Sequence, residues 1–208
     1  MFSGIITQCG RIQAVFDVGL DRTLTLAVAD PHFWHDVHVG DSLAVNGCCL
    51  TVVTLGTQTA TVQLTAETLR CTTLDQCRVG DTVHLEKSLL LSDRVHGHLV
   101  QGHVDGIGIV TRTTLEGLAV VLEVALPLAL AKYVVEKGSI TLNGVSLTLN
   151  RVQGADISIH LIPHTQQVTT LTTLQKGDSV NVETDMLAKY LYKMMHPYLE
   201  KSHDTFHS

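Results

Sequence analysis

A thiol and a hydroxyl stand at matching places in two copies of one motif. The sequence Asn-Gly-Cys-Cys-Leu-Thr at residues 46–51 returns 97 positions later as Asn-Gly-Val-Ser-Leu-Thr at residues 143–148. Cys49 therefore matches Ser146. Both side-chain types can act as nucleophiles or exchange protons when a suitable neighbour activates them. Taken alone, the match is also compatible with two residues that only pack one end of a barrel.

A histidine near the middle of the chain is present in one copy only. Gly102 matches Gly4 when the opening segment is compared with its second copy, and His103 then stands where the first copy has Ile5. Imidazole changes its charge near neutral pH. His103 is therefore a candidate for a specialised role.

The composition argues against several classes of function. The formal net charge is −6, and no cluster of lysine or arginine stands out that could neutralise nucleic-acid phosphates. The chain has no Gly-x-Gly-x-x-Gly fingerprint, no phosphate-binding loop and no Gly-x-Ser-x-Gly elbow. Histidines gather in residues 32–38 and 96–103 without an accompanying cysteine or carboxylate at metal-ligand spacing, so we expect no metal site.

The sequence also indicates where the protein works. No apolar run approaches the roughly 20 residues that a membrane helix needs, and no signal peptide is visible at the N-terminus. The five cysteines, two of them adjacent, favour reduced thiols over a disulfide framework. We expect a cytoplasmic protein that contacts neither nucleic acid nor a membrane.

The repeat predicts two domains of the same fold. It pairs Gly80-Asp81 with Gly177-Asp178 and Glu86 with Glu183 at the same offset, and a unit of this length exceeds the roughly 20–50 residues of a solenoid repeat. We place the domains at residues 1–97 and 98–186, followed by a tail at residues 187–208.

Each copy carries a pattern of short strands. Residues 23–28 alternate polar and apolar side chains, and the Asn-Gly pairs predict hairpins. The expected strands are residues 5–16, 23–28, 42–45, 50–55, 59–65 and 83–86 in the first copy, and 107–111, 119–124, 140–142, 147–152, 157–162 and 180–183 in the second. Short helices are expected at residues 66–70 and 128–136. The predicted fold class is all-β, with two similar six-stranded antiparallel Greek-key barrels in tandem and a C-terminal α-helix.

The tail has no partner in the first copy. Its apolar residues follow helical spacing and predict an amphipathic helix from about residue 186 to residue 200. The apolar stripe consists of Leu187, Tyr190, Leu191, Met194, Tyr198 and Leu199. The stripe either packs on the barrels of its own chain or assembles subunits.

Five segments together resemble riboflavin synthase of the α-chain type, the tandem lumazine-binding repeat family. They are Met-Phe-Ser-Gly-Ile-Ile at residues 1–6, the two Asn-Gly motifs, Gly-His-Leu-Val-Gln-Gly-His at residues 97–103, and Leu-Ile-Pro-His-Thr at residues 161–165. The resemblance covers nearly the whole chain in order, including the repeat and the tail.

The resemblance implies a reaction and an assembly. Such enzymes transfer a four-carbon unit between two molecules of 6,7-dimethyl-8-ribityllumazine, giving riboflavin and 5-amino-6-ribitylaminouracil, without a metal or redox cofactor. Each barrel would bind one lumazine. The active site would form between the first barrel of one subunit and the second barrel of another, in a homotrimer joined by its C-terminal helices. An association with lumazine synthase is left open.

The resemblance also implies roles for individual residues. The catalytic candidates are Cys49, His103, Lys137, Ser146, Thr148 and Asp185. His103, Ser146 and Thr148 would orient the substrate of the second barrel and assist proton transfer. Cys49 would face that substrate from the first barrel, Lys137 would contact the ribityl chain or ring edge, and Asp185 would anchor ribityl hydroxyls or polarise a neighbour.

The expected substrate contacts divide between the barrels. The first pocket would be lined by Gly4, Ile5, Ile6, Cys48, Cys49, Leu50, Gln63, Leu64, Thr65, Ala66, Glu67 and Thr68. The second would be lined by Gly102, His103, Val104, Lys137, Ser146, Leu147, Thr148, His160, Leu161, Ile162, Pro163, His164 and Thr165.

Two positions depart from the family pattern. Ser3 stands where threonine is more common, and His164 stands where an acid is common, opposite Glu67 in the first copy. The second departure removes any carboxylate role at that place. A rival hypothesis is a non-catalytic lumazine- or flavin-binding protein of the antenna type, because such proteins share the tandem-barrel plan.

Overall fold

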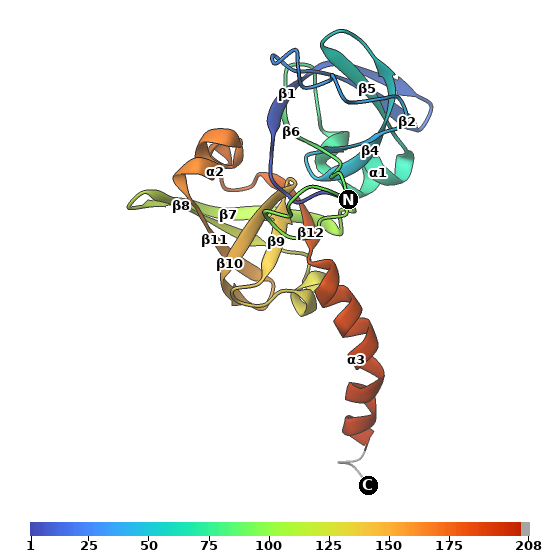
Figure 1. The fold of residues 1–208 in the computed structure, drawn as a ribbon. Helices are drawn as coiled ribbons and strands as arrows, with labels where there is room; N and C mark the ends of the chain where they lie inside the picture. The colour runs from blue at the N-terminus through green and yellow to red at the C-terminus, as the bar shows by residue number, and fades with distance from the viewer. Residues whose placement is uncertain (205–208) are drawn as a thin grey trace.

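Two closed six-stranded antiparallel barrels stand next to each other, and a long helix leaves the second one (Figure 1). The computed structural model describes residues 1–204. The first barrel contains β1 (Gln8–Val18), β2 (Asp21–Ala27), β3 (Ser42–Val45), β4 (Cys48–Leu55), β5 (Thr59–Leu64) and β6 (Thr82–Lys87). The second contains β7 (Gly106–Glu116), β8 (Ala119–Ala125), β9 (Ser139–Leu142), β10 (Val145–Gln153), β11 (Asp156–Leu161) and β12 (Ser179–Thr184).

Both barrels have the same circular strand order. The first runs β1-β2-β5-β4-β3-β6, and the second follows the matching order, so the pairings β2–β5 and β1–β6 recur as β8–β11 and β7–β12. In each barrel the long first strand carries a register shift, between Ile12 and Ala14 and between Val110 and Arg112. Such irregularities bend a strand around a small barrel. The predicted fold class is confirmed.

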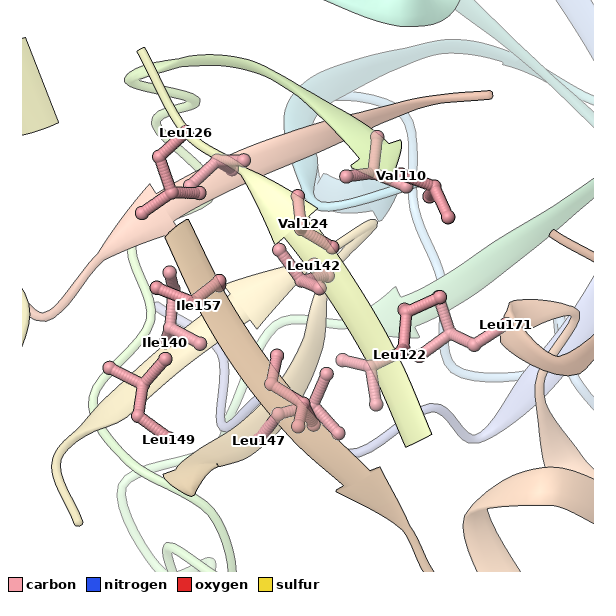
Figure 2. Close-up of a cluster of buried hydrophobic side chains, with 14 of the residues drawn as sticks. Val110, Leu122, Val124, Leu126, Ile140, Leu142, Leu147, Leu149, Ile157 and Leu171 are labelled. Carbon is pink, nitrogen blue, oxygen red and sulfur yellow. The ribbon is translucent and has the colours of Figure 1, made fainter. Parts of the chain in front are cut away.

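Alternating apolar residues fill two separate cores. Leu24, Leu26 and Val62 are fully buried in the core of the first barrel. Leu122 and Leu142 are buried in the same way in the core of the second barrel (Figure 2). Because inward and outward side chains alternate along each strand, the polar residue next to each core leucine points out of the barrel.

Short helical turns close the barrels. The structure has α1 (Ala66–Cys71), α2 (Pro163–Val168), and the 3-10 turns η1 (Thr73–Asp75), η2 (Leu128–Tyr133) and η3 (Leu171–Thr173). The helix expected at residues 128–136 is therefore a 3-10 turn that ends earlier. Val134 follows it in an extended conformation, which places its side chain in the second core.

Two arms cross between the barrels. We define the first arm as residues 1–6 and the second arm as residues 99–104. Phe2 and Val100 form an isolated antiparallel bridge with N···O distances of 2.7 and 3.0 Å. Beyond the bridge, Ile6 packs in the core of the second barrel and Val104 packs against the core of the first. The strand expected from residue 5 therefore begins only at Gln8, because its predecessor belongs to the other barrel.

The two Asn-Gly hairpins meet between the barrels. Asn46 and Asn143 have positive φ angles of 46° and 47°, and Gly47 and Gly144 follow with φ of 76° and 80°. A Cβ atom on Gly47 would lie 2.5 Å from the Gly144 nitrogen, and one on Gly144 would lie 2.7 Å from the Gly47 nitrogen. Only glycine allows the two backbones to come so close.

The C-terminal helix α3 (Met186–Asp204) projects away from both barrels (Figure 1). It contacts its own chain near its start, where Lys189 pairs with Asp105 at 2.7 Å. Leu187, Tyr190 and Leu191 are about three-fifths exposed, and Met194 is about two-thirds exposed. The structure places Tyr198 and Leu199 of the predicted stripe within α3 but does not describe their side chains, and residues 205–208 of the tail lie outside what it describes. No helix within residues 1–204 is long and apolar enough to cross a membrane.

Alanine at Gly144 should destabilise the protein strongly. Its Cβ would add overpacking to a left-handed backbone, for a loss of about 2–5 kcal/mol in the free energy of unfolding. Denaturant midpoints measure this change. Gly154→Ala is the matched control, because its φ is 61° and no atom lies within 4 Å of the added carbon. The control should lose only about 1–2 kcal/mol. Equal losses in both variants would show that the contact between the hairpins does not constrain the fold.

Candidate functional site

The crossed arms complete the opposite barrels. The Ser146 amide donates to the Gly4 carbonyl at 2.7 Å, and the Cys49 amide donates to the Gly102 carbonyl at 2.8 Å. Gly4 was expected beside Cys49, and Gly102 beside Ser146. That grouping is wrong, because the arms exchange places after the bridge between Phe2 and Val100. The contact is tight: a Cβ on either glycine would lie 2.7 Å from the Cβ of its new neighbour.

The exchange places the rest of each arm as well. His103 is exposed and directly follows Gly102, which contacts Cys49 of the first barrel. Ile6 belongs to the second barrel, while Ile5 is 40% exposed and borders a hollow of about 740 Å³ on the first barrel. Of the first arm, therefore, Gly4 and Ile6 approach the Ser146 side of the molecule.

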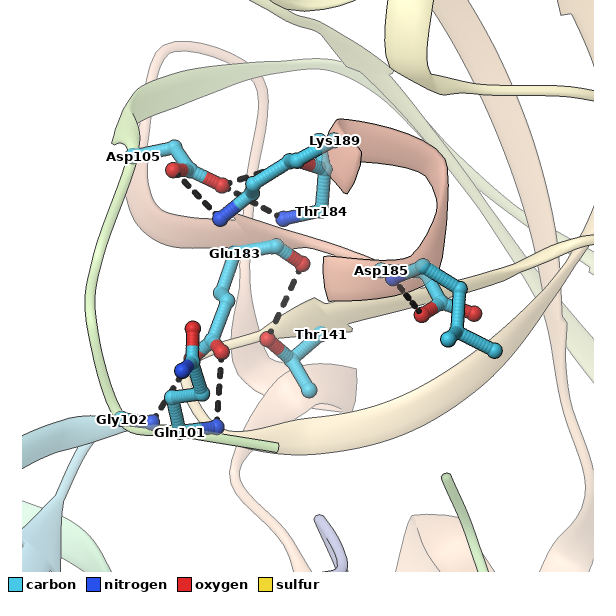
Figure 3. A network of polar contacts seen from close by, with 9 residues as sticks. Gln101, Gly102, Asp105, Thr141, Glu183, Thr184, Asp185 and Lys189 are labelled. Atoms are coloured by element: carbon cyan, nitrogen blue, oxygen red, sulfur yellow. Dashed lines mark hydrogen bonds and ion pairs between the residues drawn. The ribbon is translucent and has the colours of Figure 1, made fainter. Parts of the chain in front are cut away.

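Two buried carboxylates hold the arms. Glu86 accepts hydrogen bonds from the Ser3 amide at 2.7 Å, the Ser3 hydroxyl at 2.9 Å and the Gly4 amide at 3.1 Å. Glu183 accepts from the Gln101 amide at 2.8 Å and the Gly102 amide at 2.9 Å (Figure 3). Burial raises the pKa of both carboxyl groups, and the backbone N–H donors oppose that rise. The sequence signal for this pair was only their equal place in the repeat.

Ser146 has an imidazole partner that the sequence did not identify as a site residue. His98 Nδ1 lies 2.8 Å from Ser146 Oγ, and the His98 amide donates to the Ser3 carbonyl at 3.2 Å. Burial lowers the pKa of His98, while the nearby Asp185 charge raises it in part. The imidazole is therefore neutral at pH 7 and can share a proton with the hydroxyl. His98 stood out in the sequence only as one of a group of histidines.

Gly97 lets His98 and the first arm reach Ser146. A Cβ at this position would collide with the Ser3 carbonyl oxygen and would lie 2.8 Å from both the Cβ and the Oγ of Ser146. The segment that carries His98 thus needs a residue without a side chain immediately before it.

Asp185 lies at the start of α3. Its Oδ1 accepts from the Leu187 amide at 2.9 Å, which is the geometry of a helix N-cap (Figure 3). Its carboxylate also acts on His98 electrostatically. Beside it, Asp105 joins Thr184 and Lys189 and fixes the junction of β12 with the helix. Asp185 therefore links the helix to the surroundings of Ser146.

The expected pocket residues separate into outward and inward side chains. Cys49 and Gln63 in the first barrel, and Ser146, Thr148 and His160 in the second, point out of their barrels. Other expected residues point into the cores, so that only their backbone atoms can touch a ligand. These are Cys48, Leu50, Leu64, Leu147 and Leu161.

The remaining expected contacts surround the starts of α1 and α2. Thr65 caps α1 by accepting from the Thr68 amide, and Ala66 donates its amide to Asp21 at 3.0 Å. Glu67 bonds Arg70, and the Arg70 hydrogen bond, followed by that from Cys71, lowers the pKa of Glu67 to about 2. In the second barrel, the matching turn is formed by Ile162, Pro163, His164 and Thr165. Among residues 1–204, no three His, Cys, Asp or Glu side chains come together as metal ligands would.

Comparison with known proteins decides the family. The model of the lumazine binding domain matches residues 3–88 and again residues 101–185. The riboflavin synthase of Photobacterium leiognathi is 42% identical over 195 residues, which cover 94% of this chain and 89% of that protein. The riboflavin synthase of Schizosaccharomyces pombe is 38% identical over 201 residues, 96% of each chain.

The chain belongs to the riboflavin synthase family.

Solved structures of a second protein have the same fold. LumP complexed with riboflavin has a TM-score of 0.82 at 26% identity, covering 88% of this chain and 99% of that one. LumP complexed with 6,7-dimethyl-8-(1'-D-ribityl) lumazine has a TM-score of 0.80 at the same identity and coverage. This chain and LumP thus share one fold.

Lys137 stands out in this member of the riboflavin synthase family because its backbone is left-handed. Its φ is 65°, its side chain is exposed, and its amide donates to the Leu149 carbonyl at 2.8 Å. The first copy has Gly40 in this place, with φ of 98° and the matching hydrogen bond to Val52. A long side chain in this conformation costs about 1–2 kcal/mol, so the second barrel retains the lysine at the expense of stability. Strain of this kind gathers at functional sites.

Glycine at Lys137 should therefore stabilise the fold. We expect Lys137→Gly to raise the free energy of unfolding by about 1 kcal/mol, measured by chemical denaturation. The reverse change in the first copy, Gly40→Lys, is the matched control and should lower it by about 1–2 kcal/mol. A lower free energy of unfolding in Lys137→Gly would show that the left-handed backbone of Lys137 does not destabilise the fold.

Proposed function

We propose that the protein is a riboflavin synthase that converts two molecules of 6,7-dimethyl-8-ribityllumazine into riboflavin and 5-amino-6-ribitylaminouracil. The observation that carries the proposal is a pair of matched outward faces with unequal chemistry, which carry Cys49 and Gln63 on the first barrel and Ser146, Thr148 and His160 on the second. Each face is completed by an arm from the other half of the chain. Among the side chains that the structure describes, only those of the second face include a hydroxyl bonded to a neutral imidazole, between Ser146 and His98. A reaction that uses two copies of one molecule, with different fates, requires such a pair.

The second barrel would bind the lumazine that loses a proton from its C7 methyl group. The resulting carbanion is delocalised into the ring, so a neutral imidazole acting through the Ser146 hydroxyl is a sufficient base. His98 takes up that proton, and Asp185 stabilises the imidazolium because its charge already raises the pKa of His98. The backbone N–H groups and outward hydroxyls around Thr148 are the donors available to the developing anion.

The first barrel would present the second lumazine. Cys49 and Gln63 lie on its outward face, and His103 approaches this face through the arm exchange. We propose that His103 acts on the first barrel's substrate, although the family resemblance implied a role at the second. Holding two reactants in register is worth roughly 7–11 kcal/mol of the barrier, which explains how modest side chains can suffice. Lys137 supplies a cation for the ribityl chain or ring edge.

Incubation with the lumazine alone tests the function. We expect riboflavin and the diaminouracil in equal amounts, measured by chromatography with fluorescence detection. Ser146→Ala and His98→Asn should each lower kcat roughly 100-fold or more while changing the Kd of the lumazine little, because general acid–base groups contribute about that much. Lys137→Gly should instead weaken binding. A protein that binds the lumazine tightly but forms no riboflavin would instead be a non-catalytic binder, the alternative that the likeness to LumP supports.

The pH profile tests the role of His98. Its pKa lies below the ordinary value of about 6.5, so kcat/KM should remain level down to that pH and fall only below it. His98→Asn should lack this acid limb. If the acid limb of the kcat/KM profile were unchanged in His98→Asn, the limb would belong to another titrating group.

We further propose that the working pair of faces lies between subunits of a homotrimer in the cytoplasm. The support is α3, which carries the exposed apolar residues Leu187, Leu191 and Met194. The cytoplasmic location rests on the odd number of cysteines in the sequence. An association with lumazine synthase remains a further proposal, which follows only from the family resemblance.

Mixed subunits would distinguish a shared site from a site within one chain. Thr51 and Thr148 are matched outward residues of β4 and β10, so Thr51→Trp blocks one face and Thr148→Trp the other without entering a core. Each variant alone should be inactive. Co-expressed, they should regain activity if one subunit's first barrel works with another's second barrel. Failure to regain activity in mixed trimers, with each variant folded by circular dichroism, would place the pair within one chain.

A further inference from the structure

His84 is a buried histidine that none of the steps above uses. It lies on the outward face of β6, is 1% exposed, and sits between the two barrels. Its Nδ1 lies 2.9 Å from the Asn143 carbonyl oxygen of the opposite hairpin. Its Nε2 lies 2.8 Å from the Thr170 amide nitrogen and 2.9 Å from the Thr170 hydroxyl. Both ring nitrogens are therefore engaged by the second barrel.

Asn181 makes the same connection in the opposite direction. It is the counterpart of His84 in β12, and its Nδ2 donates to the Asn46 carbonyl at 2.9 Å. Its Oδ1 accepts from the Thr73 amide at 2.7 Å. Each barrel thus reaches across with one side chain to hold the other's hairpin. The two braces differ in one chemical respect, because an asparagine side chain does not titrate and a histidine side chain does.

The hydrogen bonds of His84 fix its protonation state. The Asn143 carbonyl can only accept, so Nδ1 must carry a hydrogen, and the Thr170 amide can only donate, so Nε2 must be free of one. A proton added at Nε2 would face the Thr170 N–H. It could then be accepted only by the Thr170 hydroxyl, and the amide would lose its partner.

We propose that His84 is a positioning residue that holds the Asn143–Ser146 hairpin against the first barrel only while its imidazole is neutral. Ser146 lies three residues after Asn143. The close backbone contact between Gly144 and Gly47 restricts the movement of this hairpin. Loss of this brace under acid would therefore disturb the placement of Ser146 relative to His98. The part of this inference that concerns turnover rests on the proposed function, whereas the brace itself does not.

The groups around His84 set the direction of its response to pH. Burial lowers its pKa, and the hydrogen bond to Asn143 opposes that shift. The titratable neighbours are Cys9, which is opposite His84 on β1, and Glu86, two residues along β6. Since the folded pKa is depressed, the brace contributes its full stability above about pH 6.5. That contribution is lost as the pH falls from there toward the folded pKa.

Nitrogen-detected NMR of the full-length protein tests the brace without any assay of activity. We expect His84 to be the Nδ1–H tautomer at pH 7.5 and to titrate below 6.5, and the Ser146 amide signal to shift with it. The Nε2–H tautomer, an ordinary histidine pKa, or a Ser146 amide that ignores the titration would each overturn the proposal.

Two variants separate the effect of the hydrogen bonds of His84 from the effect of its size. His84→Asn copies the Asn181 arrangement and should keep the brace at every pH, whereas His84→Phe keeps a ring but has no nitrogen. His98, whose pKa burial also lowers, contributes an acid loss of stability to every variant. Denaturant midpoints should therefore fall further between pH 7.5 and 5.5 in the wild type than in His84→Asn. His84→Phe should already be destabilised at pH 7.5 and should then show only the smaller fall seen in His84→Asn. A wild-type and a His84→Asn protein with the same acid response would refute the brace.

Turnover gives the last readout. His98 contributes its own acid limb to both proteins. The informative quantity is therefore the kcat of His84→Asn divided by the kcat of the wild type. We expect this ratio to rise by roughly two- to tenfold from pH 7.5 to pH 5.5, as one hydrogen bond would give. A constant ratio would show that the brace does not position Ser146. Absence of riboflavin from the wild type would contradict the proposed function instead, and the NMR and denaturation results would still decide the brace.

Discussion

The approach of Gly47 to Gly144 governs how the two barrels fit together. The backbones are so close that a single added carbon on either side would collide with the other. At that separation, a side chain from one barrel can reach the main chain of the other, as His84 and Asn181 do. Two barrels held further apart would need water or longer side chains between them. The hairpins that meet here are also the ones that carry Cys49 and Ser146, so the closest contact and the candidate chemistry share one structural element.

The crossing of the arms follows from the same closeness. Each arm is too short to form a strand of its own, yet it supplies an apolar side chain, Ile6 or Val104, to the opposite core. Each outward face is therefore complete only when both halves of the chain have folded. The two barrels and their arms therefore form a symmetrical framework, in which single residues at matched positions can differ between the two copies. Lys137 replaces a glycine, and His98 is added beside Ser146, without altering the strands that support them.

Local patterns made much of the fold predictable. Alternating side chains and the Asn-Gly pairs fixed the strands near residues 42–55 and 139–153 to within a few positions, because period-two burial and left-handed turn residues act over short distances. The arm exchange could not be foreseen in this way. Ile6 and Val104 have the same apolar character in either barrel, so only the tertiary contact between Phe2 and Val100 decides their place. The same limit concealed the bond from His98 to Ser146, which joins residues 48 positions apart.

Glu86 and Glu183 show why the symmetrical part of the frame uses charge. A carboxylate in this interface is costly to bury, and burial does raise the pKa of both. Each one, however, faces backbone N–H groups of an arm that has no neighbouring strand to accept them, and an unpaired N–H there would itself cost about 1–3 kcal/mol. An ionised carboxylate only accepts, and its two oxygens can receive two or more such donors at once. The carboxylates therefore take the place of a missing strand, and the arms can cross to the other barrel without leaving their amides unbonded.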